Sequence, residues 1–399
     1  MKHLPKAAKA ALLVLGGAAA LCLLAVAALF CLSGGFMKPA YLEPWSKSYA
    51  AGFPDPRVRA AARGLLAASN HNMQPWKIKL DGSDPQTFYL YADSSRMTRE
   101  VDPDARQMMI SQGTFLEYAA VAAQQDGYSA SIRLFPAGVY DETRLAQSMD
   151  EKPVAEITLS KAAKAGSALY GALFLPDTNR DAYKAQKLSA GQVSALESLP
   201  APQGVSVRIV QDFAGVRDIG SYALKSAEVE AGVARVMDES NAIFRPNEYA
   251  KNRYRYGYSV EGQGVSGFRK DMLQGVLTIF PSLNTGKAAS QNFIGYTKTS
   301  VESAPAYALL VSSGNGRVQQ VESGMLYSRL VLTGHTLGLA MQPLSQVLEE
   351  YPEMHALYAG FRQKYAPGGG TVQMLFRVGV PTQSVPVSMR RDISSLLAH

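Results

Sequence analysis

The hydrophobic pattern divides the chain into an apolar N-terminal run and a longer region of mixed character. From Ala10 to Met37 there is no charged residue, and Ala, Leu and Val dominate. At about 1.5 Å per residue, this run exceeds a hydrocarbon core of roughly 30 Å, so it predicts a membrane-spanning helix. A cleaved signal peptide is the alternative, but the run is long for one and shows no persuasive cleavage site. We therefore expect residues 1–37 to form an uncleaved, single-pass signal anchor.

Charges flanking this run predict its orientation. Lys2, Lys6 and Lys9 precede it, whereas Lys38 and Glu43 follow it. Positive charge tends to stay on the cytoplasmic side, so we expect a cytoplasmic N-terminus and an extracytoplasmic globular region. We interpret residues 38–53 as a linker between the two.

Beyond residue 53, helical and alternating patterns follow one another in two groups. A first unit, residues 54–173, is expected to contain a helix over Val58–Ala68 after Asp55-Pro56, strands at Lys77–Leu80 and Thr87–Ala92, a helix from Asp102-Pro103 to Gly127, and a strand at Ser131–Phe135. A second unit, residues 174–399, is expected to contain helices at Ser189–Leu199, Val216–Ile243, Glu322–Gly338 and Gln346–Lys364, and strands at Ala306–Ser312 and Thr371–Val378. This order of elements favours an α+β sandwich of three layers over a doubly wound sheet.

One helical pattern occurs twice. Gly113–Gly127 and Gly324–Gly338 have the same spacing between glycines, an apolar stripe, and a final glycine where a left-handed cap costs least. Two unrelated amphipathic helices are the alternative to a duplication.

The stretch from Ser69 to Trp76 reads Ser-Asn-His-Asn-Met-Gln-Pro-Trp and lies between a predicted helix and a predicted strand. Ser, Asn and Gln donate and accept hydrogen bonds without charge, which suits the polar edge of a large uncharged ring such as a flavin. A turn capped by its own Asn and Ser side chains is the alternative.

This stretch resembles the flavin-binding signature of the nitroreductase family, and its His-Asn form is most similar to the Acg-type branch. The resemblance implies that Ser69, Asn70, His71 and Asn72 contact FMN, and that Gln74 and Trp76 shape its pocket. It also implies a nitroreductase-like fold with two units fused in one chain. We therefore expect a monomeric pseudo-dimer that contains within one chain what is usually a dimer.

Two basic segments are candidates for the FMN phosphate. Thr178, Asn179 and Arg180 can hold a phosphate by hydrogen bonding and charge, although a polar helix cap looks the same. Thr178 and Arg180 match the last two positions of the family's Arg-x-Ser-x-Arg motif, whose first arginine is replaced here by Pro176. The resemblance implies that Arg390 or Arg391, near the C-terminus, supplies the missing ligand.

The resemblance also implies roles for two further segments. Gly338 and Leu339 would place a backbone NH at flavin N5, although a plain helix cap would look identical. The aromatic and basic segment from Arg253 to Gly267 would form a loop over the flavin, with Tyr256 and Tyr258 as lid candidates. These tyrosines could equally pack against the protein.

Composition argues against several other classes of protein. The net charge is +7, and basic and acidic residues are interspersed, which does not suggest a nucleic-acid-binding arm. Both cysteines, Cys22 and Cys31, lie in the apolar run, and the five histidines have no metal-ligand spacing, so we expect no metal site. No Walker A loop or nucleophile elbow occurs.

These observations predict a membrane-tethered, FMN-dependent oxidoreductase. We expect NAD(P)H to be the electron donor and a small, electron-poor molecule, nitro or quinone-like, to receive two electrons through flavin N5. An FMN-binding or FMN-sequestering protein with little turnover is the alternative. A membrane interaction protein that keeps the fold without flavin is a third possibility.

Overall fold

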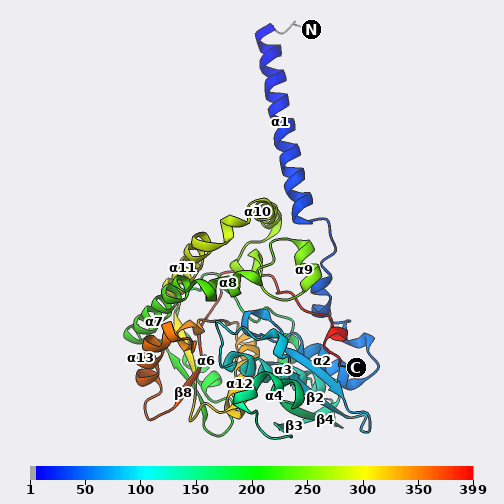
Figure 1. The fold of residues 1–399 in the computed structure, drawn as a ribbon, viewed down its shortest axis with the longest axis vertical. Coiled ribbons are helices and arrows are strands. Elements are labelled where there is room, and N and C mark those ends of the chain that lie inside the picture. Colours follow the sequence, from blue (N-terminus) through cyan, green and yellow to red (C-terminus); the bar gives the residue numbers. More distant parts are fainter. Residues whose placement is uncertain (1–5, 165, 399) are drawn as a thin grey trace.

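A long N-terminal helix projects from the rest of the protein (Figure 1). The computed structural model describes residues 6–164 and 166–398, so Lys2, His3 and His399 lie outside the described residues. The helix, α1, spans Lys6–Ser33, and its part Ala10–Ser33 is long and apolar enough to cross a membrane. Most of its large apolar side chains are exposed.

The remaining chain builds two four-stranded antiparallel sheets with the same strand order. The first sheet has the order β1-β2-β4-β3 and the second the order β5-β6-β8-β7. The strands are β1 Trp76–Leu80, β2 Thr87–Ala92, β3 Tyr128–Leu134, β4 Ala155–Lys161, β5 Val205–Val210, β6 Ala306–Ser312, β7 Ala340–Pro343 and β8 Thr371–Gly379. The predicted α+β class is therefore confirmed, and the bounds of β2 and β6 agree with the predicted strands.

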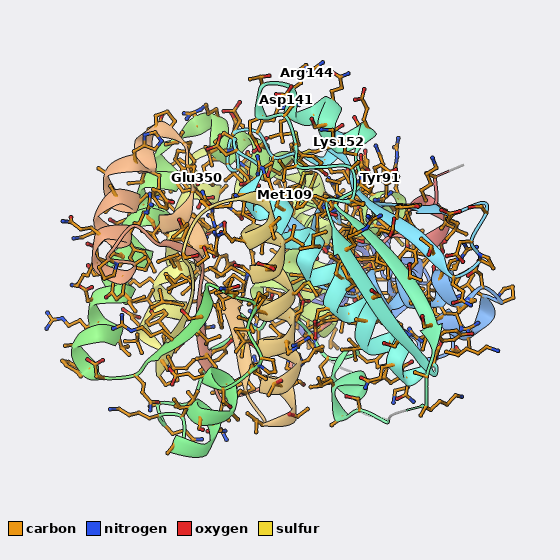
Figure 2. All side chains as sticks on the ribbon, turned by 90° about the horizontal axis from the view of Figure 1, so that it is seen from below. Tyr91, Met109, Asp141, Arg144, Lys152 and Glu350 are labelled. Atoms are coloured by element: carbon orange, nitrogen blue, oxygen red, sulfur yellow. The ribbon has the colours of Figure 1, made fainter. Side chains whose placement is uncertain are left out.

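Two helices of 20 residues cross at the centre, α3 over Arg106–Gln125 and α12 over Arg317–Thr336. We call the part of the chain that carries the first sheet the first half and the part that carries the second sheet the second half. Figure 2, which looks at the molecule from below, shows strands of the first half on one side of α12 and strands of the second half on the other. Gly113 and Gly324 are each the eighth residue of their helix, and they meet at the crossing. A Cβ on Gly113 would lie 1.8 Å from the carbonyl oxygen of Val321, and one on Gly324 would lie 1.9 Å from that of Ile110. Glycine is therefore required at both positions.

The second glycine of each predicted repeat also has a structural reason. Gly127 and Gly338 follow the ends of α3 and α12 with φ of 85° and 72°, in the left-handed region. Only glycine adopts this conformation without cost, so each helix can turn directly into the strand that follows it.

Each central helix begins with an arginine that reaches into the opposite half. Arg106 donates to the carbonyl oxygens of Leu348 and Gln373 at 2.6 and 2.7 Å and lies 3.4 Å from Glu350. Arg317 donates to the carbonyl oxygen of Asp104 and pairs with Glu142. The two halves are thus tied together by reciprocal buried or partly buried contacts.

The other α-helices of the folded part surround this centre. They are α2 Pro56–Gly64, α4 Leu145–Glu151, α5 Ala168–Ala172, α6 Ala190–Glu197, α7 Phe213–Gly232, α8 Ala234–Ala242, α9 Glu248–Tyr254, α10 Gly267–Ile279, α11 Gly286–Glu302 and α13 His355–Tyr365. Helices α7–α11 all belong to the connection between β5 and β6. Figure 1 shows that α9 and α10 lie nearest the lower end of α1.

Several elements differ from the predicted ones. The single helix predicted over Val216–Ile243 is two helices that break at Val233, where the backbone is extended. The helix predicted from Gln346 is also shorter, because Pro352 begins a separate 3₁₀ turn before α13. Strands β4, β5 and β7 were not predicted. The segment 267–302, for which no element was predicted beyond the loop that ends at Gly267, contains α10 and α11.

The expected linker and the C-terminal tail are both packed against the first half. In residues 38–53, Tyr41 and Trp45 are buried, and the Trp45 indole NH donates to the carbonyl oxygen of Ser388 at 2.8 Å. Further along the tail, the amide of Ile78 donates to Leu396, and the amide of Ala398 donates back to Ile78. The tail thus follows β1, although the sequence places it after the second sheet.

Candidate functional site

A cavity of about 360 Å³ lies between the two halves, in the usual size range of ligand pockets. It is lined by the Ser69–Asn72 segment, by α3, and by residues 176–180 at the start of the second half. Helices α8 and α11, the 257–264 loop, the segment after β7 and the tail residues 385–389 complete it. Segments distant in sequence therefore converge on one site.

The backbone of the 69–76 segment is strained at the cavity wall and directly behind it. His71, Asn72 and Gln74 have φ of 46°, 52° and 51°, in the left-handed region that side chains other than glycine disfavour. Three such residues within four positions cost free energy, of order 1–3 kcal/mol each. Strain that the surrounding structure maintains is typical of functional segments.

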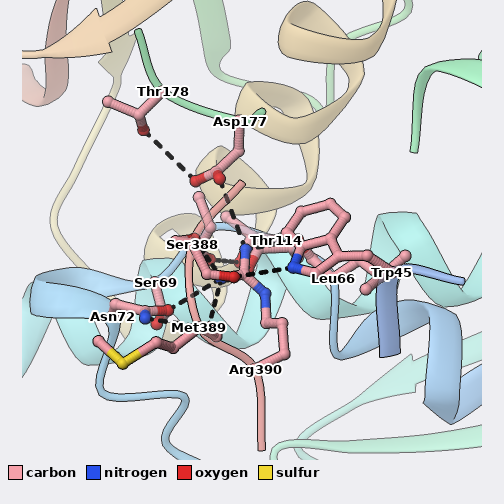
Figure 3. A network of polar contacts seen from close by, with 12 residues as sticks. Trp45, Leu66, Ser69, Asn72, Thr114, Asp177, Thr178, Ser388, Met389 and Arg390 are labelled. Carbon is pink, nitrogen blue, oxygen red and sulfur yellow. Dashed lines mark hydrogen bonds and ion pairs between the residues drawn. The ribbon is translucent and has the colours of Figure 1, made fainter. Parts of the chain in front are cut away.

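Asn72 uses its side chain to hold other parts of the chain. Its amide nitrogen donates to the carbonyl oxygens of Gly257 and Met389 at 2.9 and 3.1 Å, and its oxygen accepts from Arg390 (Figure 3). Both amide hydrogens are therefore engaged within the protein. Asn72 fastens the 257–264 loop and the C-terminal tail over the cavity that it lines.

Ser69 and Asn70 also line the cavity and also have partners. The Ser69 hydroxyl oxygen accepts from the amide of Gln74 at 2.9 Å, and the Asn70 side chain donates to Thr98 and accepts from Ser111. Each polar group thus stabilises the local turn as well as facing the cavity.

Gln74 and Trp76 lie behind the cavity wall. Gln74 is fully buried, and its oxygen accepts from the amide of Arg391 while its nitrogen donates to the carbonyl oxygen of Arg255. Trp76 is fully buried in the apolar core and donates to the carbonyl oxygen of Ser111 at 2.8 Å. Neither side chain lines the cavity, so both act on its shape from behind.

His71, in the 69–76 segment, has a side-chain nitrogen that no other described residue engages. Its Nδ1 is buried, has no hydrogen-bond partner among the described residues, and the residue lines the cavity. Burial, together with the nearby charge of Arg180, lowers the pKa of His71 to about 4. The imidazole is therefore neutral at pH 7 and can donate or accept one hydrogen bond.

Arg180 presents its guanidinium to the cavity. Its one hydrogen bond within the described chain is a long one, 3.4 Å, to the carbonyl oxygen of Gly262. Burial lowers its pKa, yet a guanidinium stays protonated at neutral pH. Thr178 lines the cavity beside it, whereas Asn179 is buried and donates to the carbonyl oxygen of Gln383 at 3.0 Å. Arg180 and Thr178 are thus placed to meet an anion.

Arg390 and Arg391 do not line the cavity. Arg390 is fully buried, donates to the carbonyl oxygens of Leu66 and Ala67, and lies 3.5 Å from Asp177 (Figure 3). Arg391 donates to the carbonyl oxygens of Gln74 and Ser395. Both guanidinium groups therefore anchor the C-terminal tail.

Gly338 and Leu339 also lie away from the cavity. The amide of Leu339 donates to the carbonyl oxygen of Gly334 at 2.8 Å, and that of Gly338 donates to His335, so both amides complete the end of α12. Residues 342–346, from the end of strand β7 onward, line the cavity instead.

The two lid candidates have different positions. Tyr258 lines the cavity, and burial raises its pKa to about 12. Tyr256 faces away and stacks on the guanidinium groups of Arg96 and Arg245, 4.5 and 4.7 Å from its ring centre. The loop over the cavity is thus held by cation–π contacts on its outer side.

Several cavity-lining residues were not predicted from sequence. They share a buried polar atom without a hydrogen-bond partner in the described chain: Gln107 Nε2, Glu230 Oε2, Ser240 Oγ, Asn241 Nδ2, Tyr327 Oη, Gln346 Oε1, Glu349 Oε2 and Gln373 Oε1. Buried polar groups in proteins normally have partners, so such a concentration indicates a place for a polar ligand or water. Tyr327 lies within the repeated helical pattern Gly324–Gly338. This repeat is the one sequence signal that pointed to the segment around Tyr327.

Two of these residues form an acidic pair. Glu230 lies in the last turn of α7, Glu349 follows the 3₁₀ turn Ser345–Leu348, and both are buried. Burial raises the pKa of Glu230 to about 8. Burial first and then the charge of Glu230 raise the pKa of Glu349 well above its usual range. The pair therefore keeps a proton at neutral pH, next to the cavity.

The chain has curated relatives over most of its length. No protein-family model matches it. Two curated proteins of Mycobacterium tuberculosis, one from each of two strains, are each 26% identical over 354 residues, which cover 86% of this chain and 92% of the relative. Their name assigns them provisionally as an NAD(P)H nitroreductase. This similarity supports the nitroreductase family for the chain.

Solved nitroreductases show a weaker likeness. An FMN-dependent nitroreductase of Mycobacterium smegmatis in complex with NADPH has a TM-score of 0.32 and 16% identity, over 55% of this chain and 92% of that one. A nitroreductase with bound FMN from Desulfitobacterium hafniense has a TM-score of 0.31 and 12% identity, over 57% and 96%. Scores this low carry no conclusion about function.

Proposed function

We propose that this protein is an FMN-dependent oxidoreductase of nitroreductase type that takes electrons from NAD(P)H. The observation that carries the proposal is the cavity between the two halves, which combines a free guanidinium, a neutral histidine and many unpartnered polar atoms. The sequence similarity to relatives named as NAD(P)H nitroreductases supports it.

The residues at the cavity fit the phosphate of FMN. Arg180 forms no ion pair within the described chain, and Thr178, whose hydroxyl donates to Asp177 at 3.3 Å, lines the same cavity. A guanidinium binds phosphate oxygens through charge-assisted hydrogen bonds. Asp177 also lines the cavity, but the buried guanidinium of Arg390 offsets its negative charge. We therefore assign the phosphate to Arg180 and Thr178, with Arg390 as the support behind them.

The residues also fit a large uncharged ring. His71 Nδ1, Gln107 Nε2 and Tyr327 Oη are unpartnered groups that can bond ring nitrogens and carbonyls. Ile110 adds apolar contact from α3. When bound, FMN would supply the two-electron chemistry, and the protein would bind, orient and shield it.

We further propose that the chain is a fused pair of units held in the membrane by α1. The shared strand order, the paired glycines and the reciprocal arginines support the duplication. The length and apolar composition of Ala10–Ser33 support the membrane tether. An electron-poor nitro or quinone-like molecule would be the acceptor.

Flavin content tests this proposal directly. In the detergent-purified full chain, we expect about one FMN per chain in the native protein. Arg180→Gln should weaken FMN binding about 10- to 100-fold, because a charge-assisted hydrogen bond contributes roughly 1.5–3 kcal/mol. Arg208→Gln, which alters an exposed arginine of β5, is the matched control and should not change FMN binding. A colourless native protein that cannot be reconstituted would refute the proposal.

The hydrogen bonds that Asn72 makes across the cavity, which we call the clasp, favour a second candidate function. This candidate is a protein that binds or sequesters FMN with little turnover. Asn72 holds Gly257 and Met389 over the cavity, which would slow exchange of a bound ligand. Stopped-flow mixing with NADH or NADPH separates the two candidates. Rapid bleaching of the flavin absorbance is expected for the oxidoreductase, and stable absorbance with both nucleotides would favour sequestration.

A further inference from the structure

Exposed apolar side chains gather on the segments that adjoin the end of α1. They are Phe36, Phe268, Ile279, Phe280 and Leu283, which we call the collar surface. Phe36 follows α1, Phe268 and Ile279 belong to α10, and Phe280 and Leu283 belong to the turn after it. Figure 1 shows α10 at the top of the globular part, beside the lower end of α1. Large exposed apolar groups in one region usually mark an interaction site.

The collar surface is fixed to the last turns of α1. The hydroxyl of Tyr249 in α9 donates to the carbonyl oxygen of Cys31 at 3.1 Å. Gly275 in α10 packs so closely that a Cβ there would lie 2.5 Å from the carbonyl oxygen of Leu29. Because Leu29 and Cys31 lie inside the proposed membrane span, α9 and α10 must lie at the level where that span leaves the bilayer.

Charges around the collar surface suit a lipid headgroup region. Among residues 248–287, the exposed charged side chains are Arg253, Arg269 and Lys287, and all are basic. The acidic residues of this segment are paired: Glu248 and Glu261 with Lys251, and Asp271 with Lys270. Apolar side chains combined with unpaired basic ones are typical of segments that lie in a membrane interface.

The cavity reaches the collar surface. Asn284 lines it and directly follows the exposed Leu283, and Asn292, Phe293 and Tyr296 of α11 line the same side. Tyr296 also keeps solvent-exposed surface, so it lies at the margin of the cavity. The aromatic rings of Phe293 and Tyr296 suit contact with a flat ring. The side-chain amides of Asn284 and Asn292 can donate to carbonyl groups of that ring.

We propose that the collar surface lies in the membrane interface and that the cavity receives a membrane-dissolved, quinone-class electron acceptor from the lipid side. The proposal rests on the proposed function and names its substrate class. NAD(P)H gives up a hydride, and the quinone takes up two electrons and two protons to become a quinol. One proton comes from solvent, so the reaction balances.

Lipid contact is measurable without any enzymatic activity. Phe280→Trp places an indole on the collar surface of the full chain, which we would reconstitute into nanodiscs of brominated lipid. The native Trp45 and Trp76 are buried and provide a constant background. We expect the bromines to quench the added emission at least about twofold, relative to unbrominated lipid.

Val139→Trp is the matched control for this measurement. Val139 is 58% exposed against 55% for Phe280, and it lies between β3 and α4, which Figure 1 draws at the end opposite α1. The control should show no added quenching. Equal quenching of both variants, or of neither, would overturn the placement of the collar surface in the interface.

A second experiment tests the substrate class. In nanodiscs, Phe280→Asp should raise the apparent KM for long-chain ubiquinone dissolved in the bilayer about tenfold and leave turnover of water-soluble benzoquinone unchanged. Val139→Asp should change neither. Reduction of benzoquinone but not of bilayer ubiquinone by the native protein would overturn entry from the lipid. Reduction of neither would overturn the acceptor class, whereas bound FMN that NADH or NADPH bleaches would still support the proposed function. The quenching result would still decide the membrane contact.

Discussion

The two halves of the molecule share a strand order and a central helix, yet they differ sharply at one connection. Residues 81–86 join β1 to β2, whereas residues 211–305 join β5 to β6 and contain five helices. That longer connection supplies α8, α11 and the 257–264 loop to the cavity, as well as the collar surface beside α1. The shared parts build the scaffold, and the unshared insertion builds much of the site.

The central helices show the same difference at the level of single residues. Ser111 and Thr114 of α3 line the cavity, whereas the residues at the same positions of α12 are Glu322 and Met325. Met325 packs against the apolar core of the first half. At these two positions, the same framework thus lines the cavity in α3 and, at Met325, contacts the apolar core in α12.

The largest effect is expected where the two halves are most alike. Gly113→Ala and Gly324→Ala should each lower the free energy of unfolding by about 3 kcal/mol or more, because each added Cβ meets a backbone carbonyl that cannot move without separating the helices. Denaturant unfolding of the detergent-solubilised chain measures both. Gly295→Ala in α11 meets no atom within 4 Å and should stabilise by up to about 1 kcal/mol. A clearly unequal loss of unfolding free energy in Gly113→Ala and Gly324→Ala would show that the two helices do not contribute equally to the crossing.

The loss of stability on replacing Arg106 or Arg317 should increase with the burial of the groups that each arginine contacts. Arg106→Met should cost about 3–5 kcal/mol, because it leaves Glu350 and two carbonyl oxygens buried without their donor. Arg317→Met should cost less, about 1–2 kcal/mol, since the Glu142 side chain is 58% exposed and water can solvate it. Thermal unfolding of both variants, beside exposed Arg133→Met as the control, decides the order. An equal loss would show that burial does not control these contacts.

A smaller effect, limited to ligand release from the cavity, is expected at the clasp, which joins the β5–β6 connection to the first half. Asn72→Ala removes bonds to Gly257 and Met389 and should accelerate FMN release about tenfold, corresponding to roughly 1–2 kcal/mol. Asn72→Asp keeps the acceptor for Arg390 but loses both donors, so it should behave similarly. Release is followed by flavin fluorescence after dilution. Unchanged rates in both variants would mean that this clasp does not hold the loop closed.

The last expected effect is a slope of stability with pH rather than a loss at one pH. Because burial raises the pKa of Glu230 to about 8, the folded protein keeps a proton that the unfolded chain loses near pH 4.5. This group therefore stabilises the fold fully at low pH, and its contribution falls by about 1.4 kcal/mol per pH unit until about pH 8. Glu230→Gln should flatten that slope between pH 5 and 8, whereas the exposed Glu228→Gln should not. An unchanged slope in Glu230→Gln would exclude a protonated pair.

Much of the framework was predictable because its signals are local. The repeated glycines, the caps after both central helices and the strands β2 and β6 follow from residue spacing alone. Asp102, where the helix was predicted to begin, instead lies before α3 and accepts from the amides of Gln107 and Met108 in its first turn. The helix itself begins later, at Arg106, because Ala105 before it adopts a left-handed conformation.

The candidate site was only partly predictable, because a side chain's availability depends on distant partners. Arg180 and Arg390 look alike in sequence, yet Arg180 faces the cavity, whereas both terminal nitrogens of Arg390 donate within the protein, to backbone carbonyls among other acceptors, beside Asp177. Similarly, Glu230 and Glu349 lie far apart in sequence and meet only through folding. No local pattern distinguishes a free polar group from an engaged one.

By itself, the sequence determined the apolar anchor candidate, the duplicated helix and the polar segment from Ser69 to Trp76, because helix periodicity, glycine conformation and turn chemistry act over a few residues. Tertiary structure decided which side chains line the cavity, which arginine stays free, and how the insertion meets α1. The reason is physical: burial and hydrogen-bond partners are set by the packing of distant segments, and these two quantities determine what a polar group can bind.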